Sequence, residues 1–292
     1  MNIIEMKDAV RFFNHTPAVT GMNLSVPKGC VFGLLGENGC GKTTSIKMMM
    51  GALIPQEGTV ELLGVDPVGM APEIRSRVAY VADDMALPNW MKLKEGMEIH
   101  SSYFPNWDKA KTMERLEGHK LNLSQTYGEL SKGQQRRFIL TLALAQQPEV
   151  LILDEPASGL DVGVRREFLD TLMELANERE VTILLSSHIL SDVERVIDHV
   201  AFMKNGKLVQ QANLEDLKST VKRLSFSAAP DEAALGNRFN VVSTTREGDA
   251  YQAVVDDFAE DKLSDFDCQV EHFNLEELFL LFNAEEAAER GA

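Results

Sequence analysis

The chain has 292 residues, of which 44% are hydrophobic and 25% are charged, as is usual for a globular protein with a full core. Its formal net charge of −16 argues against electrostatic binding to nucleic acid or to an anionic membrane surface. No apolar run is long enough to span a bilayer, and charged residues interrupt the N-terminal segment. We therefore expect a cytoplasmic protein without direct membrane insertion, whose three cysteines (Cys30, Cys40 and Cys268) form neither a disulfide framework nor a zinc site.

The first part of the chain is predicted to form strands. Residues 2–35 contain short apolar segments separated by turn residues such as Thr16 and Pro17, and they lead into a glycine-rich segment. The next expected elements, in chain order, are a strand at 59–63, a short helix at 67–77 and a buried strand at 78–81.

The pattern changes at residue 85. Residues 85–130 show helical spacing without strand signals, and regular alternation of helices and strands returns after them. The expected elements are helices at 132–147, 162–177 and 190–197, with apolar strands at 150–153 and 181–185. Such alternation predicts a parallel sheet covered by helices on both faces. The pair Asn205-Gly206 predicts a hairpin turn.

A compositional boundary lies near residue 214. Residues 215–292 contain 18 acidic and 7 basic residues, so 11 of the 16 excess negative charges lie there. The expected elements are strands at 223–227, 251–255 and 269–273, and a helix from Leu275 with an apolar stripe. We expect a small α+β accessory region. An acidic solvated surface is the simpler explanation of its charge, and roles in dimer contacts or regulation stay open.

The glycine-rich segment carries the first functional motif. It reads Gly36-Glu37-Asn38-Gly39-Cys40-Gly41-Lys42-Thr43-Thr44 and fits the phosphate-binding pattern G-x-x-x-x-G-K-[ST] between a strand and a helix. The glycines allow successive N–H groups to point at a polyphosphate beside the positive end of the helix. Lys42 would reach the β and γ phosphates, and Thr43 would bind Mg²⁺. The alternative is a glycine-rich turn without a ligand.

Two carboxylates follow the buried strand at 150–153. Ligands of such sheets bind at the carboxyl ends of the strands, which is where Asp154 and Glu155 lie. Asp154 is suited to hold Mg²⁺, and Glu155 is suited to accept a proton from an attacking water.

A second candidate anion site begins the helix predicted at 132–147. It reads Leu130-Ser131-Lys132-Gly133-Gln134, with Ser131 as the N-cap and Gly133 allowing close backbone approach. The alternative is an ordinary capped helix. Two anion sites so far apart in one chain suggest that the second serves the nucleotide of another copy.

Together these motifs resemble the nucleotide-binding subunits of ABC transporters, over roughly residues 3–210. The resemblance identifies residues 36–44 as Walker A, 130–134 as the signature and 150–155 as Walker B. It implies a P-loop NTPase fold in a domain of residues 1–214, with a helical subdomain at about 85–130 and an antiparallel β region. ATP and Mg²⁺ are the implied cofactors.

The same resemblance implies roles for three further residues. Asp161 ends a segment similar to the D-loop, and His188 matches the switch histidine that contacts the γ-phosphate. Phe13 aligns with the aromatic residue that stacks on adenine, with a core position in its strand as the alternative.

Two positions depart from the family pattern. Asp83 stands where the family usually has Gln, so it would bring a charged ligand to the metal or would line the groove facing the membrane partner. Cys40 replaces the usual Ala or Ser and fits as a small residue. A redox-gated loop is a minor hypothesis, in which the helix N-terminus would favour the Cys40 thiolate.

The finer resemblance is to the exporter branch that includes bacterial antibiotic-resistance ATPases. It implies a homo- or heterodimer that closes around two ATP molecules and drives a separate transmembrane permease, with the chain peripheral on the cytoplasmic face of the membrane. The alternatives are a soluble ABC ATPase in a non-transport role and a nucleotide-gated binding module with weak turnover.

Overall fold

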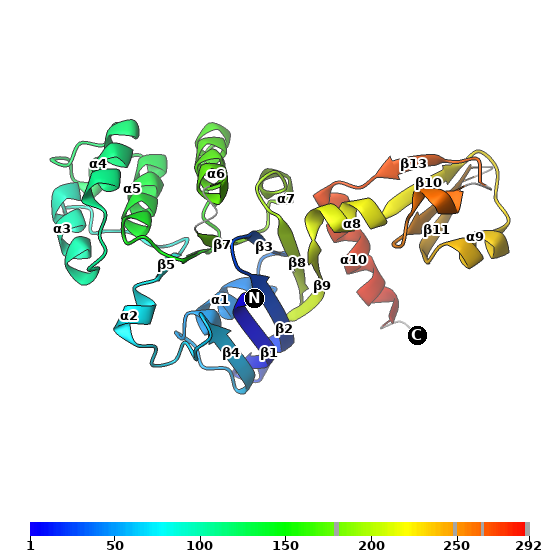
Figure 1. Cartoon of the computed structure of the whole chain (residues 1–292), viewed down its shortest axis with the longest axis horizontal. Helices are drawn as coiled ribbons and strands as arrows, with labels where there is room; N and C mark the ends of the chain where they lie inside the picture. Colours follow the sequence, from blue (N-terminus) through cyan, green and yellow to red (C-terminus); the bar gives the residue numbers. More distant parts are fainter. Residues whose placement is uncertain (178–180, 248–249, 264–265, 290–292) are drawn as a thin grey trace. The chain divides into compact units, whose positions relative to one another are not determined.

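The protein folds as two compact units. The computed structural model, shown in Figure 1, describes residues 1–177, 181–247, 250–263 and 266–289. The N-terminal unit comprises Met1–Gln211 and the C-terminal unit Ala212–Ala292.

An antiparallel sheet with the strand order β2-β1-β4 opens the N-terminal unit. Its strands are β1 (Asn2–Phe13), β2 (Thr16–Pro27) and β4 (Glu57–Leu62). The turn between β1 and β2 consists of Asn14 and His15, with φ values of 47° and 69°. Positive φ at both central residues is typical of the type I′ hairpin turn. The turn predicted at Thr16 and Pro17 is therefore wrong, because these two residues already pair with β1.

The central sheet has six strands in the order β5-β6-β7-β3-β8-β9. They are β3 (Val31–Leu35), β5 (Val78–Val81), β6 (Val150–Leu153), β7 (Thr182–Ser187), β8 (His199–Lys204) and β9 (Lys207–Asn213). The five strands from β5 to β8 in this order run parallel. Every residue of β3, β6 and β7 is buried, as in a sheet covered on both faces. The predicted parallel sheet is confirmed, and the carboxyl ends of these neighbouring strands meet at one edge.

The sequence pattern predicted the turn between β8 and β9 correctly, but it overestimated the lengths of two short helices. Asn205 and Gly206, with φ values of 47° and 80°, turn β8 into β9 and confirm the hairpin signal. The helix expected at 67–77 is shorter, since α2 spans only Pro72–Arg75 and Gly69 has a positive φ of 74°. Likewise α7 spans only Leu190–Val193.

Three helices form a group on one side of the N-terminal unit (Figure 1). They are α3 (Leu93–Tyr103), α4 (Lys109–Gly118) and α5 (Lys132–Ala145). Helix α4 packs on α5, so the helical group extends beyond residue 130. The remaining long helices are α1 (Lys42–Met49), after β3, and α6 (Val162–Asn177), which begins and ends as predicted.

Four aromatic residues in and beside α3 divide into two sets. The Phe104 ring stacks on His100 with a centroid distance of 4.7 Å, and the Trp107 ring is tilted against His100 at 5.3 Å. Trp90 and Tyr103 are instead 73% and 75% exposed. Of these four residues, Phe104 and Trp107 contribute to the packing of the group.

The C-terminal unit is a small α+β fold, as expected. Its elements are α8 (Leu214–Thr220), β10 (Lys222–Phe226), α9 (Glu232–Arg238), β11 (Val241–Glu247), β12 (Ala250–Val255), β13 (Gln269–His272) and α10 (Leu275–Glu289). The sheet is antiparallel with the order β11-β12-β10-β13. Helix α10 buries Leu275, Leu278, Phe279 and Phe282, most of the predicted apolar stripe. The sequence patterns did not indicate α8, α9 or β11.

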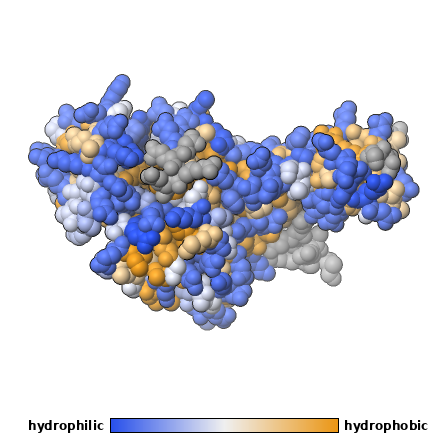
Figure 2. Space-filling view, in the orientation of Figure 1, coloured by the Kyte–Doolittle hydropathy of each residue, from blue (hydrophilic) through white to orange (hydrophobic). Residues whose placement is uncertain are grey.

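The described surface is mainly hydrophilic in the view of Figure 2. An apolar patch interrupts it on the N-terminal unit, and exposed large apolar residues in that unit include Ile54 and Val68. Among the described residues, no helix combines the length and the apolar composition that a transmembrane span requires.

Candidate nucleotide-binding site

The glycine-rich loop packs tightly between β2 and β8. A Cβ atom added to Gly36 would lie 2.4 Å from the Met203 carbonyl oxygen, and one added to Gly41 would lie 2.4 Å from that of Ala18. Gly41 also has a φ of 112°, which side chains rarely tolerate. Glycine is thus required at both positions to bring the loop against the neighbouring backbone.

Lys42 begins α1 and folds back over the loop. Its side chain is only 5% exposed, and Nζ donates to the carbonyl oxygens of Gly36 (2.7 Å) and Glu37 (3.1 Å). Nζ also lies 3.1 Å from Oε1 of Glu155. The loop therefore holds a nearly buried cation, and the neighbouring Thr43 side chain is exposed.

Asp154 lies buried at the carboxyl end of β6. Its N–H donates to the Val81 carbonyl of β5 (2.9 Å), and its Oδ1 accepts from the hydroxyl of Ser186 (2.7 Å). The Ser186 oxygen also accepts from the N–H of Glu155 (2.9 Å). Ser186 is fully buried on β7, so one hydroxyl fixes both consecutive carboxylate residues. This role of Ser186 was not predicted, although the polar pair Ser186-Ser187 at the end of an apolar strand is a usable signal.

Glu155 is held between two basic groups. Its Oε2 lies 2.8 Å from Nδ1 of His188, while its Oε1 faces Lys42. An ionised carboxylate only accepts hydrogen bonds, so the ring hydrogen belongs on Nδ1. The backbone of Glu155 is in the left-handed region, with a φ of 48°. Residues predicted from three separate motifs thus converge at the edge of three neighbouring strands.

The signature segment begins α5, and the predicted N-cap is confirmed. The Ser131 hydroxyl accepts from the N–H of Gln134 (3.3 Å), and the Gln134 side chain accepts from the N–H of Ser131 (2.9 Å). A Cβ on Gly133 would lie 2.5 Å from Val164 of α6, so this end of α5 packs closely on α6.

Ser158, which begins the D-loop segment, donates its N–H to the Glu155 carbonyl (3.1 Å), but the predicted signature residues and Asp161 are not bonded to the carboxylate cluster in the described part of the chain. Within the described residues, no hydrogen bond or ion pair joins Ser131, Gly133, Gln134 or Asp161 to Lys42. Asp161 is exposed, and its carbonyl accepts from the N–H of Arg165 (2.9 Å). The role of these residues at the nucleotide of another copy stays a prediction.

Phe13 lies at the end of β1 with its side chain 44% exposed. The Arg11 guanidinium carbon is 5.2 Å from the centroid of its ring. The alternative that Phe13 is a core residue is therefore wrong, and its neighbour Phe12 is also exposed.

Asp83 follows β5 and forms an ion pair. Its Oδ1 accepts from Nη2 of Arg136 at 2.7 Å. The carboxylate is thus engaged by α5, and its predicted role as a metal ligand stays a prediction.

Cys40 is buried in the loop. Burial raises the pKa of its thiol, and the positive charge of Lys42 opposes this effect without outweighing it. The expectation that the helix N-terminus would favour the thiolate is wrong, because loss of hydration dominates at this position.

We expect Cys40 to react slowly with thiol reagents. A raised pKa lowers the thiolate fraction at every pH below it, so labelling at pH 8 is expected to be at least about tenfold slower than in the urea-unfolded chain. Site-resolved mass spectrometry measures this rate for each cysteine. Equal rates in the folded and unfolded chain would contradict the assigned burial, and loss of ATPase activity in mild peroxide that Cys40→Ser prevents would restore the redox hypothesis.

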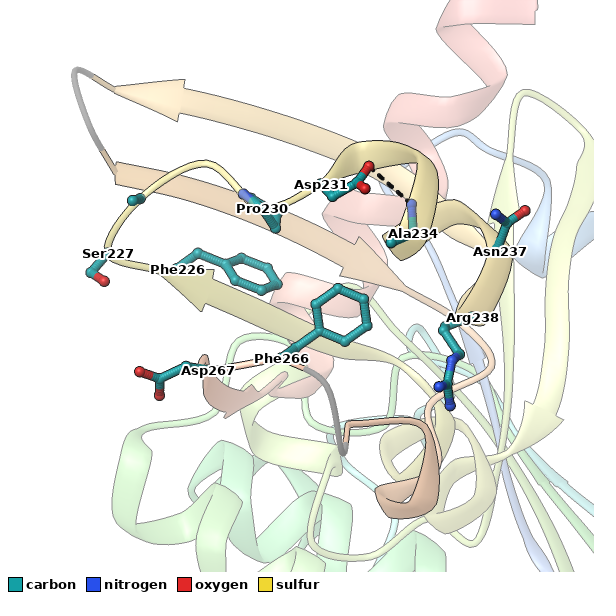
Figure 3. A pocket seen from close by; sticks show the side chains of 10 residues that line it. Phe226, Ser227, Pro230, Asp231, Ala234, Asn237, Arg238, Phe266 and Asp267 are labelled. Atoms are coloured by element: carbon teal, nitrogen blue, oxygen red, sulfur yellow. Dashed lines mark hydrogen bonds between the residues drawn. The ribbon is translucent and has the colours of Figure 1, made fainter.

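A further cavity, of about 640 Å³, belongs to the C-terminal unit. In Figure 3 the rings of Phe226 and Phe266 lie along it, and Asp231 turns back onto the backbone of α9. The Asp231 carboxylate accepts from the N–H groups of Ala233 and Ala234 at 3.0 and 3.2 Å. None of the predicted site residues lines this cavity.

A lysine-bearing phosphate loop after β3, beside carboxylates from β6, defines the N-terminal unit as a P-loop nucleotide-binding domain. A family model described as ABC transporter matches residues 19–158. A bacitracin transport ATP-binding protein of Bacillus licheniformis is 32% identical over 237 residues, which cover 80% of this chain and 77% of that protein. The chain therefore belongs to the ATP-binding subunits of ABC transporters, and it is an ATPase of that family.

Further matches agree. An ABC transporter ATP-binding protein of Bacillus subtilis is 25% identical and covers 90% of this chain and 89% of its own length. A Nod factor export ATP-binding protein of Burkholderia orbicola is 33% identical over 71% of this chain and 70% of its own. A solved ATP-binding subunit of an ABC transporter superposes with a TM-score of 0.65 at 26% identity, covering 74% of this chain and 92% of that structure.

Proposed function

We propose that this chain hydrolyses Mg-ATP to drive an export permease encoded separately. The observation that carries the proposal is the Glu155 carboxylate, 3.1 Å from Lys42 and 2.8 Å from His188. Relatives named for bacitracin transport and for Nod factor export favour an export role over the non-transport alternatives.

In this proposal the nucleotide replaces the present partners of Lys42. The ammonium leaves the loop carbonyls and Glu155 for the β and γ phosphates, which frees Glu155 to accept a proton from the attacking water. The hydroxyl of Thr43 and the carboxylate of Asp154 are hard oxygen ligands that suit Mg²⁺. The ion would neutralise phosphate charge. His188 would contact the γ-phosphate through Nε2, while Nδ1 keeps its contact with Glu155.

The remaining predicted residues complete the nucleotide site. Backbone N–H groups of the loop would cradle the phosphates, and the exposed face of Phe13 would stack on the base. The loop residues assigned to this role are Gly36, Asn38, Gly39, Cys40, Gly41 and Thr44.

A second copy would complete each site. Ser131, Gly133, Gln134 and Asp161 have no described contact with the carboxylate cluster of their own chain, which suits groups that face the nucleotide of a partner. We propose an ATP-closed homo- or heterodimer with two composite sites.

The permease would contact the helical group. Trp90, Ile99 and Tyr103 are 73%, 52% and 75% exposed there, and large exposed apolar side chains commonly mark protein interfaces. Such docking would place the chain peripherally on the cytoplasmic face of the membrane.

The composite site can be tested at Ser131 without loss of its helix cap. Asp and Asn both cap helices well, but only Asp adds a negative charge that repels a phosphate. We expect Ser131→Asp to lower Mg-ATP hydrolysis at least about tenfold and to prevent ATP-dependent dimers, while Ser131→Asn has a smaller effect. Phosphate release and gel filtration measure the two outcomes.

Mixing variants tests whether the second half comes from another copy. Ser131→Asp and Lys42→Ala chains, each inactive alone, form mixed dimers with one intact site. Their mixture should recover at most about a quarter of the wild-type rate, since half of the dimers are mixed and one of two sites works. No recovery, with mixed dimers demonstrated, would contradict the composite site.

A further inference from the structure

We propose that Asp83 is a positioning residue, which fixes the signature helix α5 through Arg136 and does not bind the metal. This inference rests on the proposed function for its catalytic meaning, but its structural basis does not depend on it.

The contact between Arg136 and the end of β5 has several parts. Nη1 of Arg136 donates to the Ala82 carbonyl at 3.0 Å. Nη2 donates to both the carbonyl and the carboxylate of Asp83, with 2.7 Å to Oδ1. The Arg136 side chain is 15% exposed and that of Asp83 is 53% exposed. A planar guanidinium thus binds three acceptors on two consecutive residues, which fixes its direction as well as its distance.

This contact lies close in the chain to the signature segment, and it is one residue from the strand position that bonds to Asp154. Arg136 is five residues after Ser131, in the second turn of α5. Ala82 directly follows Val81, whose carbonyl accepts the N–H of Asp154 at 2.9 Å. A short covalent and hydrogen-bonded path therefore connects the signature segment to the carboxylates of β6.

The charges explain why Asp suits this position. The guanidinium of Arg136 is largely removed from water, and a carboxylate supplies the negative charge that offsets its desolvation. A neutral Gln could not supply that charge. If Asp83 turned to a metal ion, the buried guanidinium would lose its anionic partner, which opposes a ligand role.

Hydrogen exchange in the nucleotide-free protein tests the structural part. We expect Asp83→Asn and Arg136→Gln each to speed exchange of the Gln134 and Gln135 amides about threefold to tenfold, as for loss of a partly exposed charged pair. The double variant should match Arg136→Gln, because loss of the guanidinium already removes all three hydrogen bonds and, with them, the ion pair to Asp83. Asp84→Asn, the same change at the adjacent carboxylate, is the control and should exchange as the wild type does.

A Mg²⁺ titration of ATP hydrolysis separates positioning from metal binding. A positioning residue lowers kcat in both Asp83→Asn and Arg136→Gln, and more in the second, which also loses the bonds to two carbonyls. Neither variant changes the Mg²⁺ concentration for half-maximal rate. A tenfold rise of that concentration in Asp83→Asn alone would overturn the proposal in favour of a metal ligand, as would unchanged amide exchange in both variants. Should the wild type prove inactive, the proposed function fails, whereas the exchange experiment still decides the role of this ion pair.

Discussion

Replacement of Glu155 by glutamine is expected to lower ATP turnover by about 10² to 10⁴, the usual contribution of a general base. Glutamine keeps the shape of the side chain but cannot take the proton of an attacking water. It also removes the negative partner of Lys42, which lies 3.1 Å away. Lys42 then has no ion pair with residue 155 to break when it binds phosphates, so ATP affinity should be retained or increased. Phosphate release and equilibrium nucleotide binding measure the two effects separately.

The same variant should accumulate as an ATP-bound dimer, because closure proceeds and cleavage does not. Glu149→Gln is a matched control: it makes the same change just before the other end of β6, where Glu149 pairs with Arg77. Its turnover should stay within about twofold of the wild type, since exposed ion pairs contribute little. Normal turnover in Glu155→Gln would exclude Glu155 as the base. A strictly monomeric variant at saturating Mg-ATP would instead contradict the proposed dimer.

Local sequence patterns were sufficient for most elements of the N-terminal unit. The boundaries of β5, β6 and α6 coincide with the predicted ranges, because these segments have uniform apolar or helical periodicity. The glycine loop and the N-cap of α5 were also predicted, since each is made by residues close together in the chain. The turn of the first hairpin was not, because Asn14 and His15 lack the glycine that usually marks it.

Contacts between segments far apart in the chain could not be predicted from the sequence. Asp83 was recognised as a departure from the family pattern. Nothing in its segment indicated that it would pair with Arg136, or that α5 would pack beside the end of β5. Likewise Cys40 follows the local rule for a helix N-terminus, but its burial by the surrounding sheet reverses the direction of the pKa shift. Tertiary packing determines both the Asp83–Arg136 pair and the pKa shift of Cys40, and no local sequence pattern shows that packing.

Ser186 is the clearest residue whose role depends on tertiary contacts. Its replacement should have the second-largest effect on ATP turnover, after that of Glu155. Its hydroxyl donates to Asp154 at 2.7 Å and accepts from the N–H of Glu155 at 2.9 Å. Ser186→Ala leaves a buried carboxylate oxygen and a backbone N–H without this partner, at a cost of about 1–3 kcal/mol for each unsatisfied group. Part of that cost should appear as lost positioning of the two carboxylates.

We therefore expect Ser186→Ala to lower kcat about 10- to 100-fold and to raise the Mg²⁺ requirement, since 1.4 kcal/mol corresponds to about a factor of ten. Ser187→Ala is the control on the next residue. Within the described residues, the hydrogen bonds of the Ser187 hydroxyl go to the backbone of Ile189, and the Ser187 carbonyl that accepts from the Gly36 N–H is kept in the variant. Thermal unfolding of both variants separates lost stability from lost positioning. Equal kinetic effects at the two serines would mean that general weakening of this strand end, and not the bridge between Asp154 and Glu155, accounts for the loss.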